Sequence, residues 1–409
     1  MKAKPELQPF EYCVATLSLL LVFAASAAPI PLYDVYHRDF GVTYNALALT
    51  SVFYFVGAVS ALIFFGRISN HLGRKPLALL VFTMAAIACL IFIYLHGAIA
   101  LISGRLLLGL ACGLASSGIT AYIADAAPEK PEWVSATTIS ITPLIGLTLG
   151  AISSGVLVEY APFPLTLCYV VVMAGLTLCA LLLFFSEDTV TSEPGLIASF
   201  KPQFTLPKQN KPFYPVAALT FVATWALGGF LQAYGPSIAA AQLGTLNVPT
   251  ASVVFASFLL PGALGGPLTA RLTAAQAQRL GMIIFALAVV SLVIAMSQSS
   301  VMGFIIASAI AGTAQGAVLT GSVRSLMRGV ARRERAGVLS LIFATSYTGA
   351  AIPTFITGQL SAYFSLFELA IFYAVLASAV CVITLIFARE PVSAQVTNTV
   401  AVTVAEEMT

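Results

Sequence analysis

The sequence predicts an all-α membrane protein in which twelve transmembrane helices form two pseudo-symmetric six-helix bundles. Three observations predict this fold. Only 9% of the residues are charged and 59% are hydrophobic, whereas a soluble domain carries about 25% charged residues, so most of the surface must face lipid. Apolar stretches of about 20 residues recur along the whole chain. Glycine positions in the first half recur in the second half at one fixed offset.

The apolar stretches predict membrane-spanning helices because they are continuous and lack the alternation of barrel strands. The first stretch has no clear cleavage site after it, so we interpret it as a helix and not a signal peptide. The first half contains predicted spans at residues 12–33, 42–65, 77–95, 98–124, 134–157 and 165–185. The second half contains predicted spans at residues 213–235, 248–270, 280–297, 301–323, 337–360 and 366–388.

The segment between the sixth and seventh spans divides the chain in two. Residues 186–212 are rich in proline and carry mixed charge, which is the composition of a linker. We therefore predict one bundle over residues 1–185 and a second over residues 213–388. Residues 389–409 are rich in Thr, Val and Ala and are predicted to form a disordered cytoplasmic tail.

Basic residues give the predicted spans a direction. If the N-terminus is cytoplasmic, all 19 Lys and Arg except two lie in cytoplasmic segments. The exceptions are Arg38, in an outer loop, and Arg105, inside a span. The reverse orientation would invert this distribution, and an odd number of spans would break it midway. The distribution therefore predicts that both termini are cytoplasmic.

An internal repeat links the two predicted bundles. Adding 203 to the numbers of five glycines, and of Tyr160, reaches the same residue type in the second half. The pairs are Gly109 with Gly312, Gly113 with Gly316, Gly118 with Gly321, Gly146 with Gly349, Gly155 with Gly358 and Tyr160 with Tyr363. Internal duplication is typical of transporter folds that hold a central site between their repeats.

The loop between the second and third spans carries the most specific motif, formed by Gly66, Asn70, Gly73, Arg74 and Lys75. It resembles the signature loop of the major facilitator superfamily, in which an acidic residue is thought to latch the two halves at the cytoplasmic face. Here Asn70 takes that position, so the charge is missing. The alternative is an ordinary basic turn. The resemblance implies the superfamily's twelve-helix fold over about residues 10–390.

Two further motifs resemble the superfamily. Arg105 is the one basic residue well inside a predicted span, where a charge costs roughly 2.5–3.5 kcal/mol. The resemblance implies a place near the central cavity; the alternative is a side chain that extends to the interface. Gly146, Gly150 and Gly155 form a run in the fifth span that is similar to the antiporter motif of superfamily exporters, with Ala151 where a Pro is expected. Their alternative is simple helix packing.

Helix one ends in a Pro-Leu-Tyr sequence like that of many bacterial exporters of the superfamily, and Asp34 follows it. Asp34 is a candidate for the protonatable group, together with Arg105. The alternative places Asp34 at the outer interface beside Arg38, and this is the interpretation we favour. Candidate residues of the substrate cavity are Tyr33, Gln232, Tyr234, Gln315 and Tyr347. Each of them could instead serve helix packing.

The leading hypothesis is proton-coupled export of a small amphipathic drug or metabolite, with neither a cofactor nor a metal. The six cysteines and three histidines show no metal-site spacing, and no catalytic or nucleotide-binding motif is visible. The resemblance implies protons as the coupling ion, no nucleic-acid partner, a monomer and the bacterial inner membrane. The alternatives are uptake or facilitated diffusion of a sugar or organic anion, which Arg105 could bind, and a non-transporting sensor on the same scaffold.

Overall fold

A computed structural model describes residues 9–127, 132–190, 199–202, 204–331 and 334–390. These residues form helices and connecting loops, and no strand is found among them. Within the described ranges, twelve helical segments are long and apolar enough to cross a membrane, as the sequence predicts. The predicted tail lies outside the described residues apart from its first two positions, 389 and 390.

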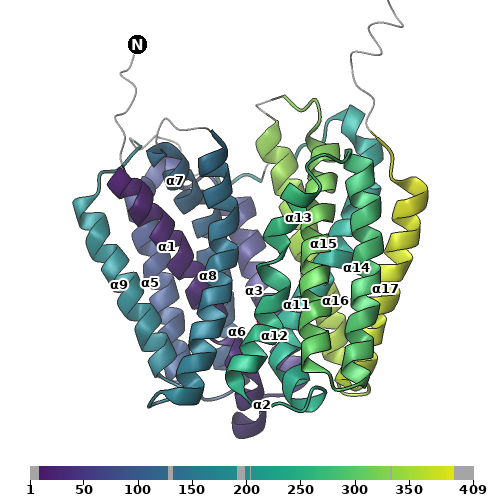
Figure 1. The fold of residues 1–409 in the computed structure, drawn as a ribbon. Helices are drawn as coiled ribbons and strands as arrows, with labels where there is room; N and C mark the ends of the chain where they lie inside the picture. The colour runs from purple at the N-terminus through teal and green to yellow at the C-terminus, as the bar shows by residue number, and fades with distance from the viewer. Residues whose placement is uncertain (1–8, 128–131, 191–198, 203, 332–333, 391–409) are drawn as a thin grey trace, which may run out of the picture.

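The first six spans form one bundle, on the left in Figure 1. Several spans are composite. The first combines α1, a 3₁₀ turn η1 and α2, and the fourth combines α6, a π-helical turn η2 and α7. The bounds are α1 Pro9–Ala27, η1 Ile30–Leu32, α2 Tyr33–Phe40, α3 Tyr44–Phe65, α4 Ser69–Leu72, α5 Arg74–Ile93, α6 Ala98–Leu114, η2 Ala115–Ile119, α7 Thr120–Ala126, α8 Glu132–Tyr160 and α9 Leu167–Phe185.

The last six spans form the second bundle, on the right in Figure 1. The bounds are η3 Lys208–Phe213, α11 Tyr214–Ala241, α12 Val248–Leu259, α13 Gly262–Leu268, α14 Ala274–Ser297, α15 Val301–Met327, α16 Arg335–Leu360 and α17 Leu366–Phe387. The 3₁₀ helix η3 runs directly into α11, so the helical seventh segment begins at residue 208, inside the predicted linker. The helical first segment likewise extends beyond the predicted span, over Pro9–Phe40.

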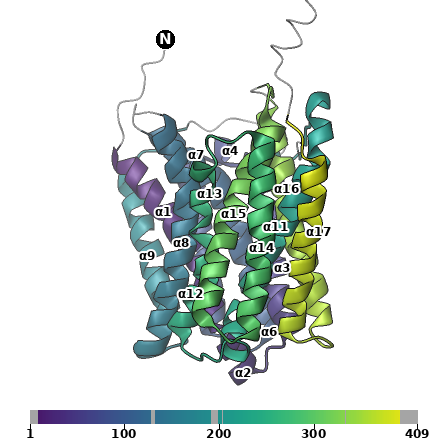
Figure 2. The same cartoon turned by 45° about the vertical axis from the view of Figure 1, so that its right-hand side comes forward.

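Because the chain crosses twelve times, its described ends lie on one face, which we call the terminal face. In Figure 1 this face is at the top, and the loop that contains α2 is at the bottom, on the opposite face. The 45° turn in Figure 2 keeps the same arrangement, with α17 now in front of the second bundle.

The repeated glycines mark equivalent helix crossings in the two bundles. A Cβ atom at Gly109 would lie 2.1 Å from the Tyr54 carbonyl oxygen, and one at Gly312 would lie 2.0 Å from the Phe258 carbonyl oxygen. The fourth span therefore crosses the second as the tenth crosses the eighth. Such close backbone approach requires glycine at both positions.

The bundles are joined in the middle of the molecule and at the opposite face. At the opposite face, the Gln359 side-chain amide donates to the Asn45 side-chain oxygen at 3.0 Å. In the middle, the rings of Phe55 and Tyr347 lie 6.0 Å apart. At the terminal face the two sets of ribbons diverge (Figure 1). The molecule is therefore held closed at the opposite face.

Candidate substrate site between the bundles

Arg105 in α6 is completely buried. Its Nη1 atom donates a hydrogen bond of 2.6 Å to the Ser26 carbonyl oxygen in α1. The Tyr54 ring of α3 lies over the guanidinium group, with 4.4 Å between Cζ and the ring centroid, which is a cation–π distance. Nε and Nη2 have no hydrogen-bond partner among the described residues. In this state the side chain does not extend to water.

Hydroxyl groups surround the arginine. Tyr33 is also fully buried and lies close enough to the guanidinium group for an electrostatic interaction, without the geometry of a hydrogen bond. The Thr50 hydroxyl donates to the Tyr33 hydroxyl at 3.0 Å. Arg105 and Tyr33, which the sequence suggested separately, are thus brought together by α6, α3 and the end of the first span.

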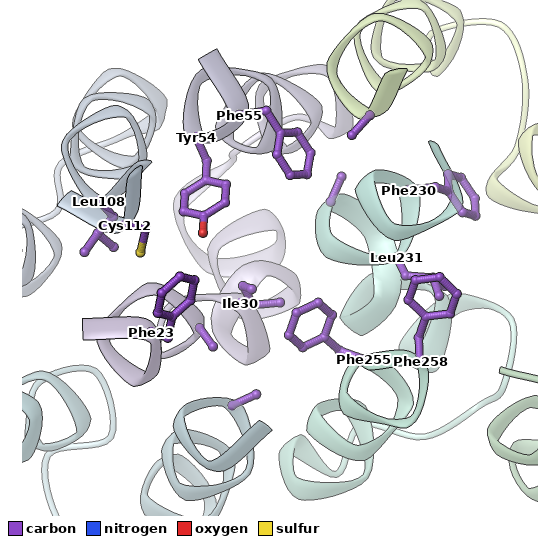
Figure 3. Close-up of a cluster of buried hydrophobic side chains, with 14 of the residues drawn as sticks. Phe23, Ile30, Tyr54, Phe55, Leu108, Cys112, Phe230, Leu231, Phe255 and Phe258 are labelled. Atoms are coloured by element: carbon purple, nitrogen blue, oxygen red, sulfur yellow. The ribbon is translucent and has the colours of Figure 1, made fainter. Parts of the chain in front are cut away.

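Aromatic rings connect this cluster to the second bundle. Tyr54 and Phe55 are adjacent on α3, and Figure 3 shows Tyr54 turned toward Cys112 and Phe55 turned toward the other bundle. Phe55 contacts the ring of Tyr347 in α16, which lies 5.1 Å from the ring of Trp225 in α11. The indole nitrogen of Trp225 is buried and has no hydrogen-bond partner in the described part of the chain.

The other predicted cavity residues lie in different surroundings. Gln315 in α15 donates to the Thr224 carbonyl oxygen at 3.2 Å, inside the second bundle. Tyr234 in α11 is fully buried, its ring 6.2 Å from that of Tyr44 and 5.3 Å from that of Phe230. Gln232 is mostly buried on the same helix, and its Nε2 atom has no hydrogen-bond partner among the residues that the structure describes. Of the five candidates, Tyr33 and Tyr347 belong to the arginine–aromatic cluster.

Asp34 lies at the end of the first span, near the opposite face. It makes no hydrogen bond to the described residues around Arg105. Its Oδ2 atom accepts a bond of 2.8 Å from Arg38 Nε, one helical turn further on, and 12% of the Asp34 side chain is exposed. This geometry supports the interface interpretation that we favoured from the sequence.

The three glycines of the fifth span have two kinds of neighbour. A Cβ atom at Gly146 or Gly150 would lie 2.5 Å from the Leu20 carbonyl oxygen or 2.3 Å from that of Ala24, both in α1 of the same bundle. At Gly155 it would lie 2.0 Å from Ser252 Oγ, in α12 of the other bundle. The run therefore combines packing within the bundle with a close contact between bundles.

One helical turn after Gly155, a carboxylate joins the two bundles. Glu159 Oε2 accepts a hydrogen bond of 3.2 Å from the backbone nitrogen of Val248, the first residue of α12. A negative charge is favourable at a helix N-terminus. Sequence analysis did not include this residue among the candidate site residues.

The signature loop is folded against its own bundle in this state. Arg74 is 8% exposed, and its Nε donates to Asp125 Oδ2 at 2.9 Å. Its Nη1 donates to Asn70 Oδ1 at 3.0 Å. Asp188 accepts from the Arg74 backbone nitrogen at 3.0 Å, and its other oxygen lies where a side chain at Gly73 would begin.

The rest of the loop also contacts its own half. Gly66 directly follows α3 and ends that helix. Lys75 Nζ donates to the Ser186 carbonyl oxygen. Asp125 and Asp188 therefore provide the negative charges that Asn70 lacks.

Sequence reasoning missed Tyr54 and Trp225, the residues that extend the cluster around Arg105. The span that contains Tyr54 also carries Tyr44, Phe53 and Phe55, so residue type alone does not single it out. Trp225 had a usable signal, because it is one of two tryptophans in the chain and lies deep within a predicted span. Tryptophan in spans usually gathers near the membrane interfaces.

A family model described as Major Facilitator Superfamily matches residues 15–273. The quinolone resistance protein NorA of Staphylococcus aureus (strain MRSA252) is 23% identical over 224 residues, 54% of this chain and 56% of NorA. The sugar transporter ERD6-like 8 of Arabidopsis thaliana is 31% identical over 110 residues, 27% of this chain and 23% of that protein. The chain thus spans about half, or less, of the length of these relatives.

Two solved structures share the fold over nearly the whole chain. A mutant of the nucleoside transporter NupG aligns with a TM-score of 0.72 at 11% identity, covering 93% of this chain and 100% of the other. The D-xylose-proton symporter aligns with a TM-score of 0.72 at 15% identity, covering 94% and 99%. At these identities the likeness concerns the fold alone.

Proposed function

Because the chain belongs to the Major Facilitator Superfamily, we propose that it is a secondary active exporter of a small amphipathic compound, driven by proton antiport. Members of this family are transporters and not enzymes, and the twelve spans make the chain a multi-pass membrane protein. Similarity to NorA supports the export branch of the family. The bacterial inner membrane is the proposed location.

The observation that carries this proposal is the buried cluster of Arg105, Tyr54 and Tyr347 at the boundary between bundles. A buried charge with unpaired hydrogen-bond donors is expensive in a membrane, and such residues usually mark a transport pathway. The cluster contains residues from both repeats. Transporters of this architecture bind substrate at the interface between the repeats. Rocking of one bundle against the other would expose it to the two faces in turn.

The proposed orientation places the terminal face in the cytoplasm, as the distribution of Lys and Arg predicts. The described state is then closed to the outside. The contacts at Gly155, Glu159 and Gln359 hold that closure. They must separate before substrate can leave the cell.

A flux assay tests the proposal. Purified protein would be reconstituted into proteoliposomes and offered a panel of drugs and metabolites, with and without an imposed pH gradient. We expect at least one amphipathic compound to accumulate against its gradient only while the pH gradient persists, with loss of accumulation on adding a protonophore. Movement of panel compounds that is equal with and without the gradient would contradict proton-coupled export.

A further inference from the structure

We propose that the central site selects an amphipathic organic anion, whose carboxylate or similar group binds the free edge of Arg105 while its apolar body lies against Tyr54, Tyr347 and Trp225. This inference rests on the proposed transport function and specifies its substrate class. It follows from the charge balance of the site, from the geometry of the guanidinium group and from the chemistry of the neighbouring rings.

The described part of the chain does not balance the charge of Arg105. Among the described residues, no carboxylate makes an ion pair with it. Asp34 pairs with Arg38, Asp125 with Arg74 and Glu390 with Arg328. The acidic residues of the described spans lie near span ends: Glu11, Asp34, Asp39, Asp125, Glu159 and Glu368. The middle of the site therefore carries an uncompensated positive charge.

The free nitrogens of Arg105 form one edge of its guanidinium group. Nη1 is taken by the Ser26 carbonyl, and the Tyr54 ring covers one face. Nε and Nη2 remain, and both are buried without a hydrogen-bond partner in the described ranges. These two atoms lie side by side in the planar group and donate parallel hydrogen bonds, which match the two oxygens of a carboxylate. Among the described residues, the edge that could bind a planar anion in bidentate fashion is thus left unpaired.

The surroundings of this edge are aromatic. Tyr54 and Phe55 project from α3, and Tyr347 and Trp225 approach from the second bundle, with ring centroids 5.1–6.0 Å apart along the series. Aromatic faces favour an apolar, preferably aromatic, ligand body. The unpartnered Trp225 nitrogen offers one more donor and no acceptor. Donors outnumber acceptors, so an anionic or acceptor-rich ligand fits better than a cation.

Cationic drugs are not the preferred substrates of such a site. A cation at this site would meet the like charge of Arg105 in a region of low dielectric, where repulsion is strong. A neutral amide of the same shape would avoid repulsion but would give up one charge-assisted bond. Such bonds contribute about 1.5–3 kcal/mol, which corresponds to about tenfold to a hundredfold in affinity.

Matched ligand triplets test the proposal in the natural chain. Each triplet keeps one aromatic body and varies the head group: 2-naphthoate, 2-naphthamide and 2-naphthylmethylamine, with the same series on benzene and indole bodies. Binding would be measured as the shift in melting temperature of the purified protein across a concentration series. We expect the acid of at least one triplet to bind about tenfold or more tighter than its amide, and the amine to bind weakest.

Variants assign the effect to Arg105. Arg105→Gln should bring acid binding down to the level of the amide, and Arg105→Lys should retain part of the difference. Arg389→Gln removes the same charge from an exposed position after α17 and should leave the preference unchanged.

Equal or tighter binding of the amide or amine in every triplet, or no binding of any acid, would overturn the proposal. A preference that survives Arg105→Gln would do the same. If acids bind selectively but show no flux driven by a pH gradient, the proposed proton-coupled export fails while the anion site stands.

Discussion

Arg105 is the residue at which transport and folding can be separated. We predict that Arg105→Ala abolishes substrate flux, because the site loses its charge and both free donors. Stability should change little, since losing the Ser26 carbonyl bond and the Tyr54 ring contact is offset by removing a buried charge with two unpaired donors among the described residues. Flux in proteoliposomes and the melting temperature of the purified protein would be measured together. Full flux with Ala would remove Arg105 from the pathway, and loss of folding would make it structural.

Among single residues, the sequence predicted Arg105, Tyr33 and Tyr347 but not Tyr54 and Trp225. A basic residue inside an apolar span is easy to recognise in the sequence. Such residues are rare because inserting a charge into the membrane is costly. The helix crossings that place Tyr54 over Arg105 depend on tertiary packing. Glu159 was missed for the same reason, because its bond to Val248 joins residues 89 positions apart and depends on tertiary packing.

At the scale of elements, two glycines of α8 face different neighbours. Gly150 faces α1 of the same bundle, whereas Gly155 faces α12 of the other bundle. Gly150→Ala should lower the melting temperature, because the new methyl group meets the backbone of α1 at Ala24. Overpacking of this kind costs about 1–3 kcal/mol. Gly155→Ala instead meets the Ser252 side chain in α12 and should weaken closure of the opposite face with a smaller change in stability.

Accessibility of an engineered cysteine at the opposite face would check this contrast. Labelling should increase for Gly155→Ala and stay at the parent rate for Gly150→Ala. Equal behaviour of the two variants would mean that Gly155 serves only packing.

The Glu159 contact supports a second prediction at this scale. Glu159→Ala removes both the hydrogen bond and the charge beside the N-terminus of α12, so the opposite face should open more often. Loss of a charge at a helix N-terminus costs about 0.3–1 kcal/mol, a shift of about two- to fivefold in the equilibrium. Glu159→Gln keeps an acceptor and should have the smaller effect, as should Gln359→Ala, which removes a neutral contact.

Distances between spin labels at positions 163 and 246, exposed on the two bundles, would measure the shift. A distance distribution that is unchanged by Glu159→Ala would show that the contact does not hold the face closed.

At the level of elements, hydrophobicity predicted all twelve spans and missed some of their ends. The first and seventh segments continue as helix beyond the apolar stretch, to Phe40 and back to Lys208. These extensions carry polar residues, so hydropathy does not mark them. The repeated glycines occur at equivalent helix crossings in the two bundles, because close backbone approach restricts the residue type directly.

For the whole molecule, the orientation in the membrane follows from the basic residues and remains a prediction. Single cysteines at Asp39 and Leu246, in a background free of native cysteines, should react with an impermeant reagent added outside the cell. Cysteines at Leu72 and Gln209, on the terminal face, should react only after the membrane is opened. External labelling of position 72 or 209 in intact cells would reverse the proposed topology.

The proposed transport depends on alternating access, which spin-label distances on both faces of one reconstituted protein would test. One pair would report the opposite face at positions 163 and 246, and another the terminal face at positions 72 and 268, all exposed. Under a pH gradient with a transported compound, we predict that the first distance lengthens while the second shortens, because the bundles rock around the Arg105 cluster. Distances that stay fixed, or that change on one face alone, would contradict the account.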